Sequence, residues 1–228
     1  PGGGRNEQTL GTQSRRRRRE VDLCRLTATL RVVEGRLLFK NCSLYRPDGR
    51  VRTGMSVLVE GRLITAVNPD DAAPVLPGDW EVKCGGRLLM PGLIDCHTRL
   101  VGGPLTPWAG DLLSLPFLDR SENERRRERT LSVGEVEAVT AFSIAQNLRR
   151  GVSMVVEHLH APGCVEEALK AQARVAQRLG LRLLNSHASS SATADSPGPA
   201  QVESNACYAS SQRSDPLVRG AIGVRASF

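Results

Sequence analysis

The stretch that decides the fold is Leu88-Leu89-Met90-Pro91-Gly92-Leu93-Ile94-Asp95-Cys96-His97-Thr98-Arg99. Its apolar residues follow two glycines and stop at polar residues, which predicts a short strand, Leu88 to Ile94, buried on both faces. Because side chains alternate along a strand, His97 and Arg99 should point to the same side. A His-x-His pattern at this place would offer two imidazoles to one metal ion. The sequence has the first histidine and an arginine in the second position.

Three segments of the chain carry a resemblance to a known family. The segment from Pro91 to Leu100 resembles the PGxIDxHxH signature of the amidohydrolase superfamily. Gly151 to His158 looks like the second strand of that family, and Val218 to Phe228 looks like its GxxGxHASF segment. The resemblance runs from about Gly35 to Phe228 and is greatest to the chlorohydrolase and aminohydrolase branch linked to selenium metabolism. It implies a metal-dependent hydrolase built on a (β/α)8 barrel.

After the opening strand, the pattern changes to alternating strands and helices, which is typical of an α/β fold with a parallel sheet. A capping box at Ser132-Val133-Gly134-Glu135 predicts a helix that runs to Arg150. The further expected elements, in chain order, are strand Val152 to Glu157, helix Val165 to Leu179, strand Leu181 to Asn185, a weaker helix within Ala200 to Gln212, and strand Val218 to Val224. A complete barrel has eight strands and roughly 250 residues. We therefore expect residues 91–228 to form a partial (β/α)8 TIM-like barrel of about four strands, the truncated N-terminal half of a metallo-hydrolase barrel.

The part of the chain before the barrel is rich in short β-prone segments separated by turns. These segments are Thr27 to Val33, Arg36 to Asn41, Ser56 to Glu60, Arg62 to Val67 and Trp80 to Lys83. Short strands joined by tight turns predict a small antiparallel β-sandwich over residues 25–90. Residues 1–24 hold the run Arg15 to Arg19 with few apolar residues, so we expect a disordered basic tail.

The composition narrows the class of protein. With 40% hydrophobic and 24% charged residues, the chain reads as a soluble globular protein. The net charge of +7 arises largely in residues 1–20, which hold six arginines against two glutamates, and aromatic residues make up only 4%, so a nucleic-acid partner is not expected. No apolar run approaches the roughly 20 residues of a membrane span, and we expect the cytoplasm as the location. The six cysteines form no C-x-x-C pair, which indicates free thiols.

All four histidines lie near the expected carboxyl ends of strands, where ligands bind in parallel α/β folds. His97 follows the first strand, His158 and His160 follow the second, and His187 follows the third. Imidazole is a preferred zinc ligand, and a catalytic zinc site has about three protein ligands and an open position for water. The resemblance implies that His97 ligates a divalent metal, zinc or iron, with His158, His160 and His187 as weaker candidates. The remaining ligands and the acid-base glutamate would come from later strands, so we expect no catalytic residue in this chain.

Two arginines depart from the family pattern. Arg99 stands where the resemblance has the second metal ligand, and a guanidinium group has no lone pair to donate to a cation. Arg225 stands where the resemblance has a histidine that faces the substrate. An arginine could instead hold a carboxylate or phosphate. Two readings stay open: a hydrolase that cleaves C–N or C–Cl bonds in heterocycles or amides and is inactive as this fragment, and a non-catalytic scaffold. The unpaired edges of half a barrel also predict homo-oligomers.

Overall fold

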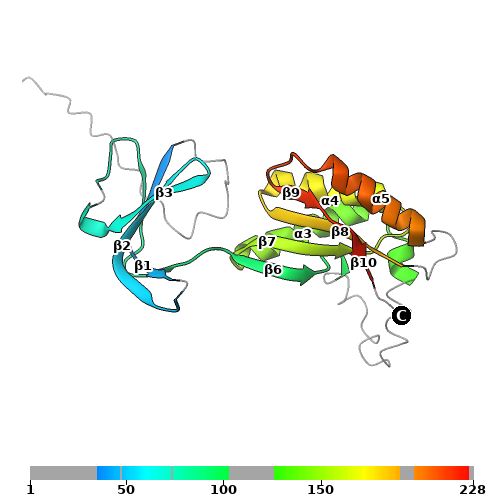
Figure 1. The fold of residues 1–228 in the computed structure, drawn as a ribbon, viewed down its shortest axis with the longest axis horizontal. Helices are drawn as coiled ribbons and strands as arrows, with labels where there is room; N and C mark the ends of the chain where they lie inside the picture. Colours follow the sequence, from blue (N-terminus) through cyan, green and yellow to red (C-terminus); the bar gives the residue numbers. More distant parts are fainter. Residues whose placement is uncertain (1–34, 47, 73, 103–125, 191–197, 226–228) are drawn as a thin grey trace, which may run out of the picture. The chain divides into compact units, whose positions relative to one another are not determined.

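The computed structural model describes residues 35–46, 48–72, 74–102, 126–190 and 198–225. The chain divides into two compact units, Pro1–Met90 and Pro91–Phe228 (Figure 1). The expected basic tail and the expected strand from Thr27 to Val33 lie outside the described residues. Each unit is built around a sheet of its own.

The N-terminal unit contains a five-stranded sheet. Its strands are β1 (Arg36–Tyr45), β2 (Val51–Glu60), β3 (Leu63–Pro69), β4 (Trp80–Lys83) and β5 (Leu88–Leu89), and a short 3-10 helix η2 (Asp70–Ala72) follows β3. The order is β3-β2-β1-β4, and β5 also pairs with β1. The four strands expected between Arg36 and Lys83 are therefore present, and β1 and β2 are longer than their β-prone cores suggest.

The pairing in this unit differs from the expected antiparallel sandwich. β1, β2 and β3 pair in antiparallel fashion, as their tight turns predict, but β4 and β5 both run parallel to β1. The described residues form one sheet and not two. The reason is the longer connection between β3 and β4, which brings the chain back beside β1 in the same direction, whereas a two-residue turn would have reversed it.

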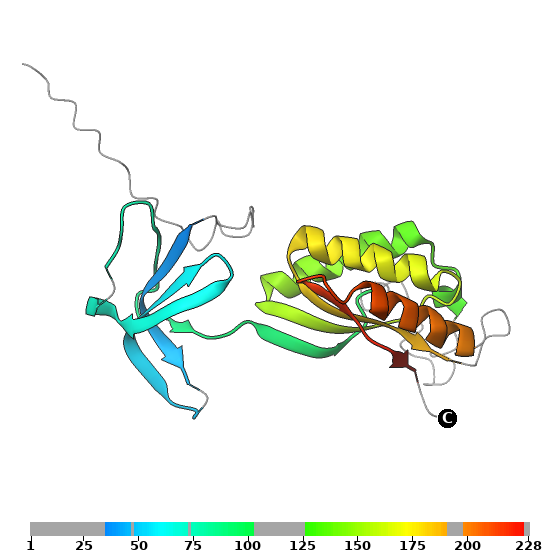
Figure 2. The same ribbon diagram turned by 45° about the horizontal axis from the view of Figure 1, so that its top comes forward.

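The C-terminal unit has a parallel sheet with helices on one face. Its elements are β6 (Leu93–Thr98), α3 (Val133–Arg149), β7 (Val152–Leu159), α4 (Val165–Leu179), β8 (Arg182–Ser189), α5 (Gly198–Ser211), β9 (Val218–Gly220) and β10 (Gly223–Val224). The order is β10-β8-β7-β6 with β9 also on β8, and every pairing is parallel. α3, α4 and α5 lie side by side against this sheet (Figures 1 and 2). The predicted α/β fold with a partial parallel sheet is confirmed.

The helix boundaries follow local signals in the sequence. The Ser132 side chain accepts a hydrogen bond from the Glu135 N–H, and the Glu135 carboxylate accepts one from the Ser132 N–H, so the predicted capping box starts α3. α4 ends at Gly180, which adopts a left-handed φ of 78°. The apolar face of α4, including Ala168, Leu169 and Val175, is fully buried in the core of the unit.

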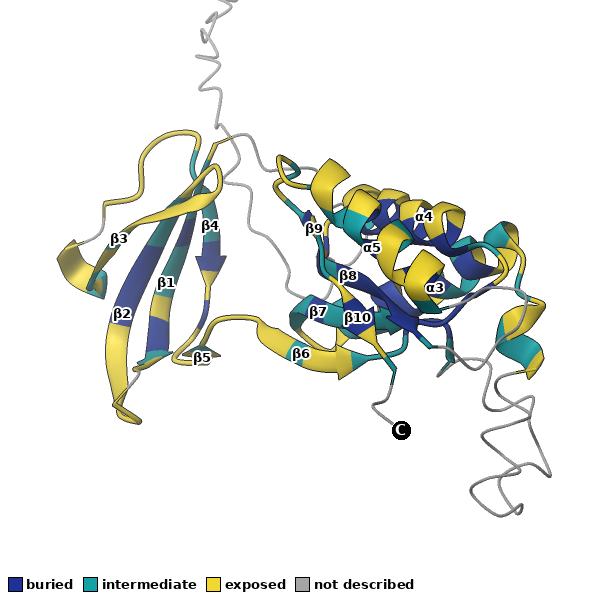
Figure 3. Ribbon diagram, turned by 45° about the vertical axis from the view of Figure 1, so that its right-hand side comes forward, coloured by how far each residue is buried: buried dark blue, intermediate teal, exposed yellow. Residues whose placement is uncertain are grey.

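The stretch from Leu88 to Ile94 is not one buried strand, and this prediction is wrong. Leu88 and Leu89 pair with β1 in the first unit, whereas Leu93 and Ile94 begin β6 in the second. Pro91 cannot donate a backbone hydrogen bond, so the ladder breaks there. Within the described residues β6 pairs only with β7, which leaves Leu93 50% and Ile94 58% exposed (Figure 3).

The expected fourth strand is divided into two short pieces. β9 pairs with Leu183 to Asn185 of β8, and β10 pairs with Ala188 and Ser189 farther along the same strand. Glycines permit this close packing. A Cβ atom on Gly220 would lie 2.4 Å from the Cα atom of Ala209 in α5, and one on Gly223 would lie 2.6 Å from the His187 carbonyl oxygen.

We expect Gly220→Ala to lower the free energy of unfolding by about 1–3 kcal/mol, because the added methyl group meets the backbone of α5. Gly134→Ala is the matched control, since nothing lies within 4 Å of its added Cβ atom. Alanine should raise the stability of α3 there by about 0.5–1 kcal/mol. Urea unfolding of the two variants checks both signs, and equal effects would contradict the packing of β9 against α5.

Candidate functional site

The candidate site lies at the carboxyl ends of the parallel strands in the C-terminal unit. His97 is in β6, His158 is in β7, His160 directly follows β7, and His187 is in β8. The strands β7 and β8 are longer than expected, so His158 and His187 lie within them and not beyond them. The structure brings the four histidines together as two pairs, one of His97 with His158 and one of His160 with His187.

The first pair is open to solvent. The ring centroids of His97 and His158 are 4.6 Å apart with a tilt of 35°. Burial lowers the pKa of the His158 imidazole, and the charges of His97 and Arg99 lower it further. The Asp95 carboxylate accepts a hydrogen bond from the His97 backbone N–H at 3.1 Å. Arg99 is thus near enough to oppose a positive charge on His158.

The second pair belongs to a buried cluster that includes Glu128 and Arg225. His160 Nδ1 lies 2.7 Å from Glu128 Oε2, and Arg225 Nη1 donates to the same oxygen at 3.1 Å. Side chains of Arg225 and Glu128 are 12% and 13% exposed. Sequence reasoning missed Glu128, because its partners are 32 and 97 residues away and no local spacing marks it.

Glu128 is the negatively charged member of this cluster. Burial alone would raise the pKa of Glu128, but the hydrogen bonds and charges of His160 and Arg225 outweigh burial and lower it. An ionised carboxylate can only accept, whereas the guanidinium of Arg225 can only donate, and Arg225 Nη1 also lies 3.0 Å from His160 Nδ1. His160 Nδ1 thus lies between an acceptor and a donor.

His187 is fixed in one tautomer by a backbone hydrogen bond. Its Nε2 atom accepts a hydrogen bond from the Ala161 N–H at 3.1 Å, so the proton of the neutral ring is on Nδ1. Burial lowers the pKa of His187 to about 3, and the neighbouring His160 adds to this effect. The two rings stack with centroids 5.5 Å apart. Within the described residues, His160 Nε2 and His187 Nδ1 have no hydrogen-bond partner.

α5 holds His187 in place through one amide side chain. Asn205 Oδ1 accepts from the His187 N–H, and Asn205 Nδ2 donates to the His187 carbonyl oxygen, each at 2.7 Å. The same Nδ2 atom donates to Ser189 Oγ at 2.9 Å. Both residues of β8 are buried, and Asn205 satisfies the backbone N–H and carbonyl oxygen of His187 on the side of β8 where no strand pairs with that residue.

The described residues do not fit a metal ion. They contain no group of three or more histidine, cysteine, aspartate or glutamate side chains that could hold one. The His187 Nε2 lone pair is taken by the Ala161 N–H, and the residue two positions after His97 is a cationic arginine. His97, His158, His160 and His187 therefore lie at the expected edge of the sheet without forming a ligand set.

A buried carboxylate links the carboxyl ends of the strands to the helices that cover the sheet. Glu157 in β7 is fully buried, and its two oxygens accept hydrogen bonds from the Leu100 N–H at 2.8 Å and from Gln172 Nε2 at 3.0 Å. Burial raises the pKa of Glu157 to about 7, although the two hydrogen bonds act in the opposite direction. Glu157 links the chain after β6 to α4.

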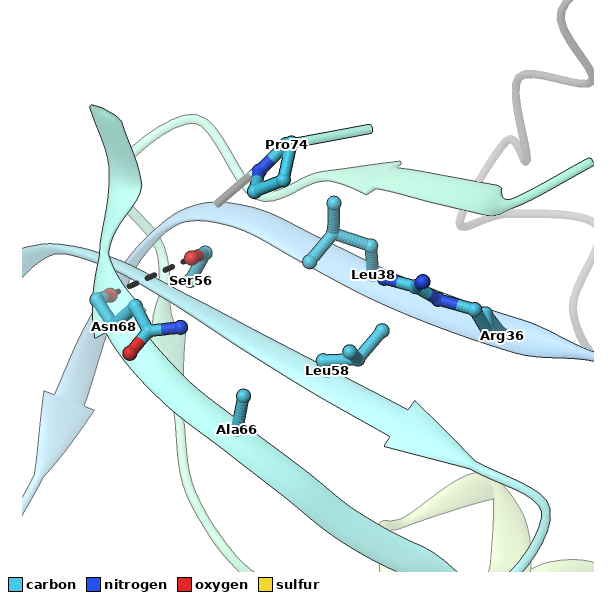
Figure 4. A pocket seen from close by; sticks show the side chains of 7 residues that line it. All are labelled: Arg36, Leu38, Ser56, Leu58, Ala66, Asn68 and Pro74. Carbon is cyan, nitrogen blue, oxygen red and sulfur yellow. Dashed lines mark hydrogen bonds between the residues drawn. The ribbon is translucent and has the colours of Figure 1, made fainter. Parts of the chain in front are cut away.

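A small cavity of about 40 Å³ lies in the N-terminal unit, which contains none of these histidines. It is lined by Arg36, Leu38, Ser56, Leu58, Ala66, Asn68 and Pro74 (Figure 4). A water molecule occupies about 30 Å³ of liquid, whereas small-molecule sites have volumes of about 300–1,000 Å³. This cavity is too small for an organic substrate.

Comparison with known proteins supports the predicted family. No protein-family profile matches the sequence. The chain is 44% identical over 54 residues to an imidazolonepropionase from Arthrobacter sp. (strain FB24), covering 24% of this chain and 13% of that protein. It is 31% identical over 126 residues to an imidazolonepropionase from Klebsiella pneumoniae (strain 342), covering 52% of this chain and 30% of that protein. The chain thus spans less than a third of these relatives' length.

The fold agrees with the sequence match. A crystal structure of an adenosine deaminase from Xanthomonas campestris with bound zinc superposes with a TM-score of 0.64 and 23% identity, covering 82% of this chain and 42% of that one. The chain is thus similar to imidazolonepropionases over part of its length and shares its fold with this deaminase, in keeping with the predicted resemblance to the amidohydrolase superfamily. The selenium-linked branch of the superfamily stays a prediction. Among the described residues, no helix has the length and apolar character needed to cross a bilayer.

We expect the stability of the folded protein to depend on pH through Glu157. Its folded-state pKa is raised from 4.5 to about 7, so the folded protein binds the proton more tightly than the unfolded chain does. This contribution is complete below about pH 4.5 and is lost as the pH rises through 7, a change of about 3 kcal/mol. Glu157→Gln should remove that slope in urea unfolding between pH 5 and 8. Glu203→Gln on the exposed face of α5 should keep it, and an unchanged slope in Glu157→Gln would contradict the assignment.

Proposed function

We propose that the chain binds a small heterocyclic or amide-containing molecule at the carboxyl ends of its parallel strands, as part of a hydrolase-type protein that cleaves C–N or C–Cl bonds. The observation that carries the proposal is the gathering of both histidine pairs at this edge, where ligands bind in parallel α/β folds. The match to imidazolonepropionases and the fold shared with an adenosine deaminase support the hydrolase class.

The described residues supply binding groups and no complete catalytic set. His187 Nδ1–H can donate a hydrogen bond to a ligand that reached it, and His160 Nε2 also has no partner among the described residues. A hydrolase also needs a group that activates water. Since these residues do not fit a metal ion, we propose that the 228-residue chain alone does not turn over substrate.

A second candidate function is a non-catalytic scaffold. Arg99 and Arg225 favour it, because both stand at positions where the superfamily resemblance has histidine. Arg225 is moreover held by Glu128, and this ion pair occupies the end of the sheet with charges that neutralise each other. On this reading, the fold persists while metal binding has been lost.

Two further proposals concern location and assembly. We propose a cytoplasmic location, in keeping with the free thiols of Cys42, Cys84 and Cys96. We also propose that the C-terminal unit self-associates, because apolar residues are exposed near both edges of its sheet. These are Leu93 and Ile94 in β6, and Ile222 and Val224 at β10.

We expect the purified chain to contain no stoichiometric zinc or iron, and Arg99→His to bind more metal than the native chain. The substitution removes a cation beside His97 and His158 and adds a lone pair. Elemental analysis after zinc loading and desalting measures the difference. Arg182→His, an exposed arginine at the opposite end of β8, is the matched control and should bind no more than the native chain.

Assays of ammonia release from adenosine accompany the metal analysis, and we expect no turnover by the native chain. Stoichiometric metal in the native chain, or turnover above that of a chelator-treated sample, would contradict the proposal and favour an intact enzyme. Equal metal content in the native chain and Arg99→His would show that Arg99 is not what excludes the metal.

A further inference from the structure

Two cysteines lie together in the core of the N-terminal unit, far along the chain from each other. Cys42 is in β1 and Cys84 directly follows β4. They are 0% and 7% exposed and belong to one apolar cluster with Met55, Val57 and Val82. Both thiols are free in this structure. None of the proposed functions uses them.

A bulge in β1 is what turns Cys42 toward Cys84. Phe39 pairs with Val57 and Cys42 pairs with Met55, so three steps along β1 match two steps along β2. The bulge contains Asn41, whose φ is 51°. Apart from glycines, no other described residue has a positive φ. Strict alternation would place Cys42 on the opposite face from Phe39. The bulge reverses this, and Phe39 and Leu44 pack against the same cluster as Cys42.

The parallel pairing of β1 with β4 brings Cys84 to the same face. Phe39 is opposite Val82, and the alternation of β4 puts Cys84 on the side of Val82. The Cys84 N–H donates to the Lys40 carbonyl oxygen at 2.8 Å, which keeps the two chains in register past the end of β4. Neighbouring strands are about 4.8 Å apart, and a disulfide joins Cα atoms about 4.4–6.8 Å apart.

Each thiol donates to a backbone carbonyl group. Cys42 Sγ donates to the Met55 carbonyl oxygen at 3.0 Å, and Cys84 Sγ donates to the Val82 carbonyl oxygen at 3.7 Å. After burial, the neighbouring Cys84 thiol is the next largest cause that raises the pKa of Cys42, so the two side chains lie close together. Burial raises the pKa of both thiols, and each is therefore protonated at neutral pH. A protonated thiol is a weak nucleophile, so oxidation should be slow and should require local opening of the sheet.

We propose that Cys42 and Cys84 are a reversible disulfide pair. The oxidant is a low-molecular-weight disulfide. The thiolate of one cysteine attacks it, forming a mixed disulfide and releasing one small thiol. The second cysteine then loses its proton and attacks the protein sulfur of the mixed disulfide, which forms the Cys42–Cys84 bond and releases the second small thiol. Two protein thiols are oxidised, and one small disulfide is reduced to two thiols.

The bond would fasten the turn that follows β4 to β1. That turn is already tied to β1, because the Gly86 N–H donates to the Asn41 carbonyl oxygen and Ser43 Oγ donates to the Gly86 carbonyl oxygen. Cross-linking restricts the unfolded chain between the two cysteines and stabilises the folded unit. We therefore expect the oxidised form to unfold at a temperature roughly 5–10 °C higher.

The test uses the full chain in which Cys24, Cys96, Cys164 and Cys207 are replaced by serine, equilibrated in oxidised and reduced glutathione. We expect an intact-mass loss of two hydrogens, a peptide that links Cys42 to Cys84, and recovery of both thiols with dithiothreitol. Cys42→Ser and Cys84→Ser in the same background are the matched controls and should show neither the mass loss nor the rise in the unfolding temperature.

Burial could slow the reaction in the folded protein, so the same chain is also unfolded and refolded in the glutathione mixture. A Cys42–Cys84 bond formed by either route, together with the higher unfolding temperature, supports the proposal. Two free thiols after both treatments would overturn it. A bond that lowers the unfolding temperature would also overturn it, since the folded sheet would then disfavour the cross-link.

Discussion

The parallel pairing of β7 with β8 is the interaction on which the C-terminal unit depends. β7 is hydrogen-bonded on both sides, to β6 and to β8, and β8 in turn carries both pieces of the fourth strand. Because all of these strands run in one direction, their carboxyl ends meet at one edge, and every histidine of the chain lies there. The helices cover one face of the sheet and supply the apolar core beneath it.

The charges at this edge determine what it can bind. In a metal site, imidazoles offer lone pairs that converge on one point. Here Glu128 fixes one imidazole, the Ala161 N–H occupies another, and two arginines add cations that a metal would have to approach. The cluster is neutralised largely by its own members, since the Glu128 carboxylate serves both Arg225 and His160. This arrangement is better suited to hydrogen bonding with a neutral ligand than to coordinating a metal ion.

The sequence predicts best those features that depend on neighbouring residues. The capping box at Ser132 and the glycine at position 180 locate α3 and α4 nearly to the residue. The ends of β7 and β8 are harder to predict, because the strands continue through polar residues that the fold buries, such as Asn185 against α4 and α5 and Ser186 against the backbone of β7. Exposure of Leu93 and Ile94 could not be read from their apolar character, since it depends on which strands pair with β6. Glu128 and Arg225 are 97 positions apart in the sequence, and no periodic pattern of residues predicts a contact over that separation.

The side chain of Asn205 gives the interruption between β9 and β10 a structural meaning. β9 ends opposite Asn185 and β10 begins opposite Ala188, so the backbone of His187 has no strand partner on this side of β8, whereas on the other side it pairs with Leu159 of β7. Asn205 fills that place with its amide, so a helix side chain acts as the missing strand residue. The backbone of one histidine in the candidate site is therefore held by β7 on one side and by α5 on the other, so a shift of α5 along its axis would act directly on His187.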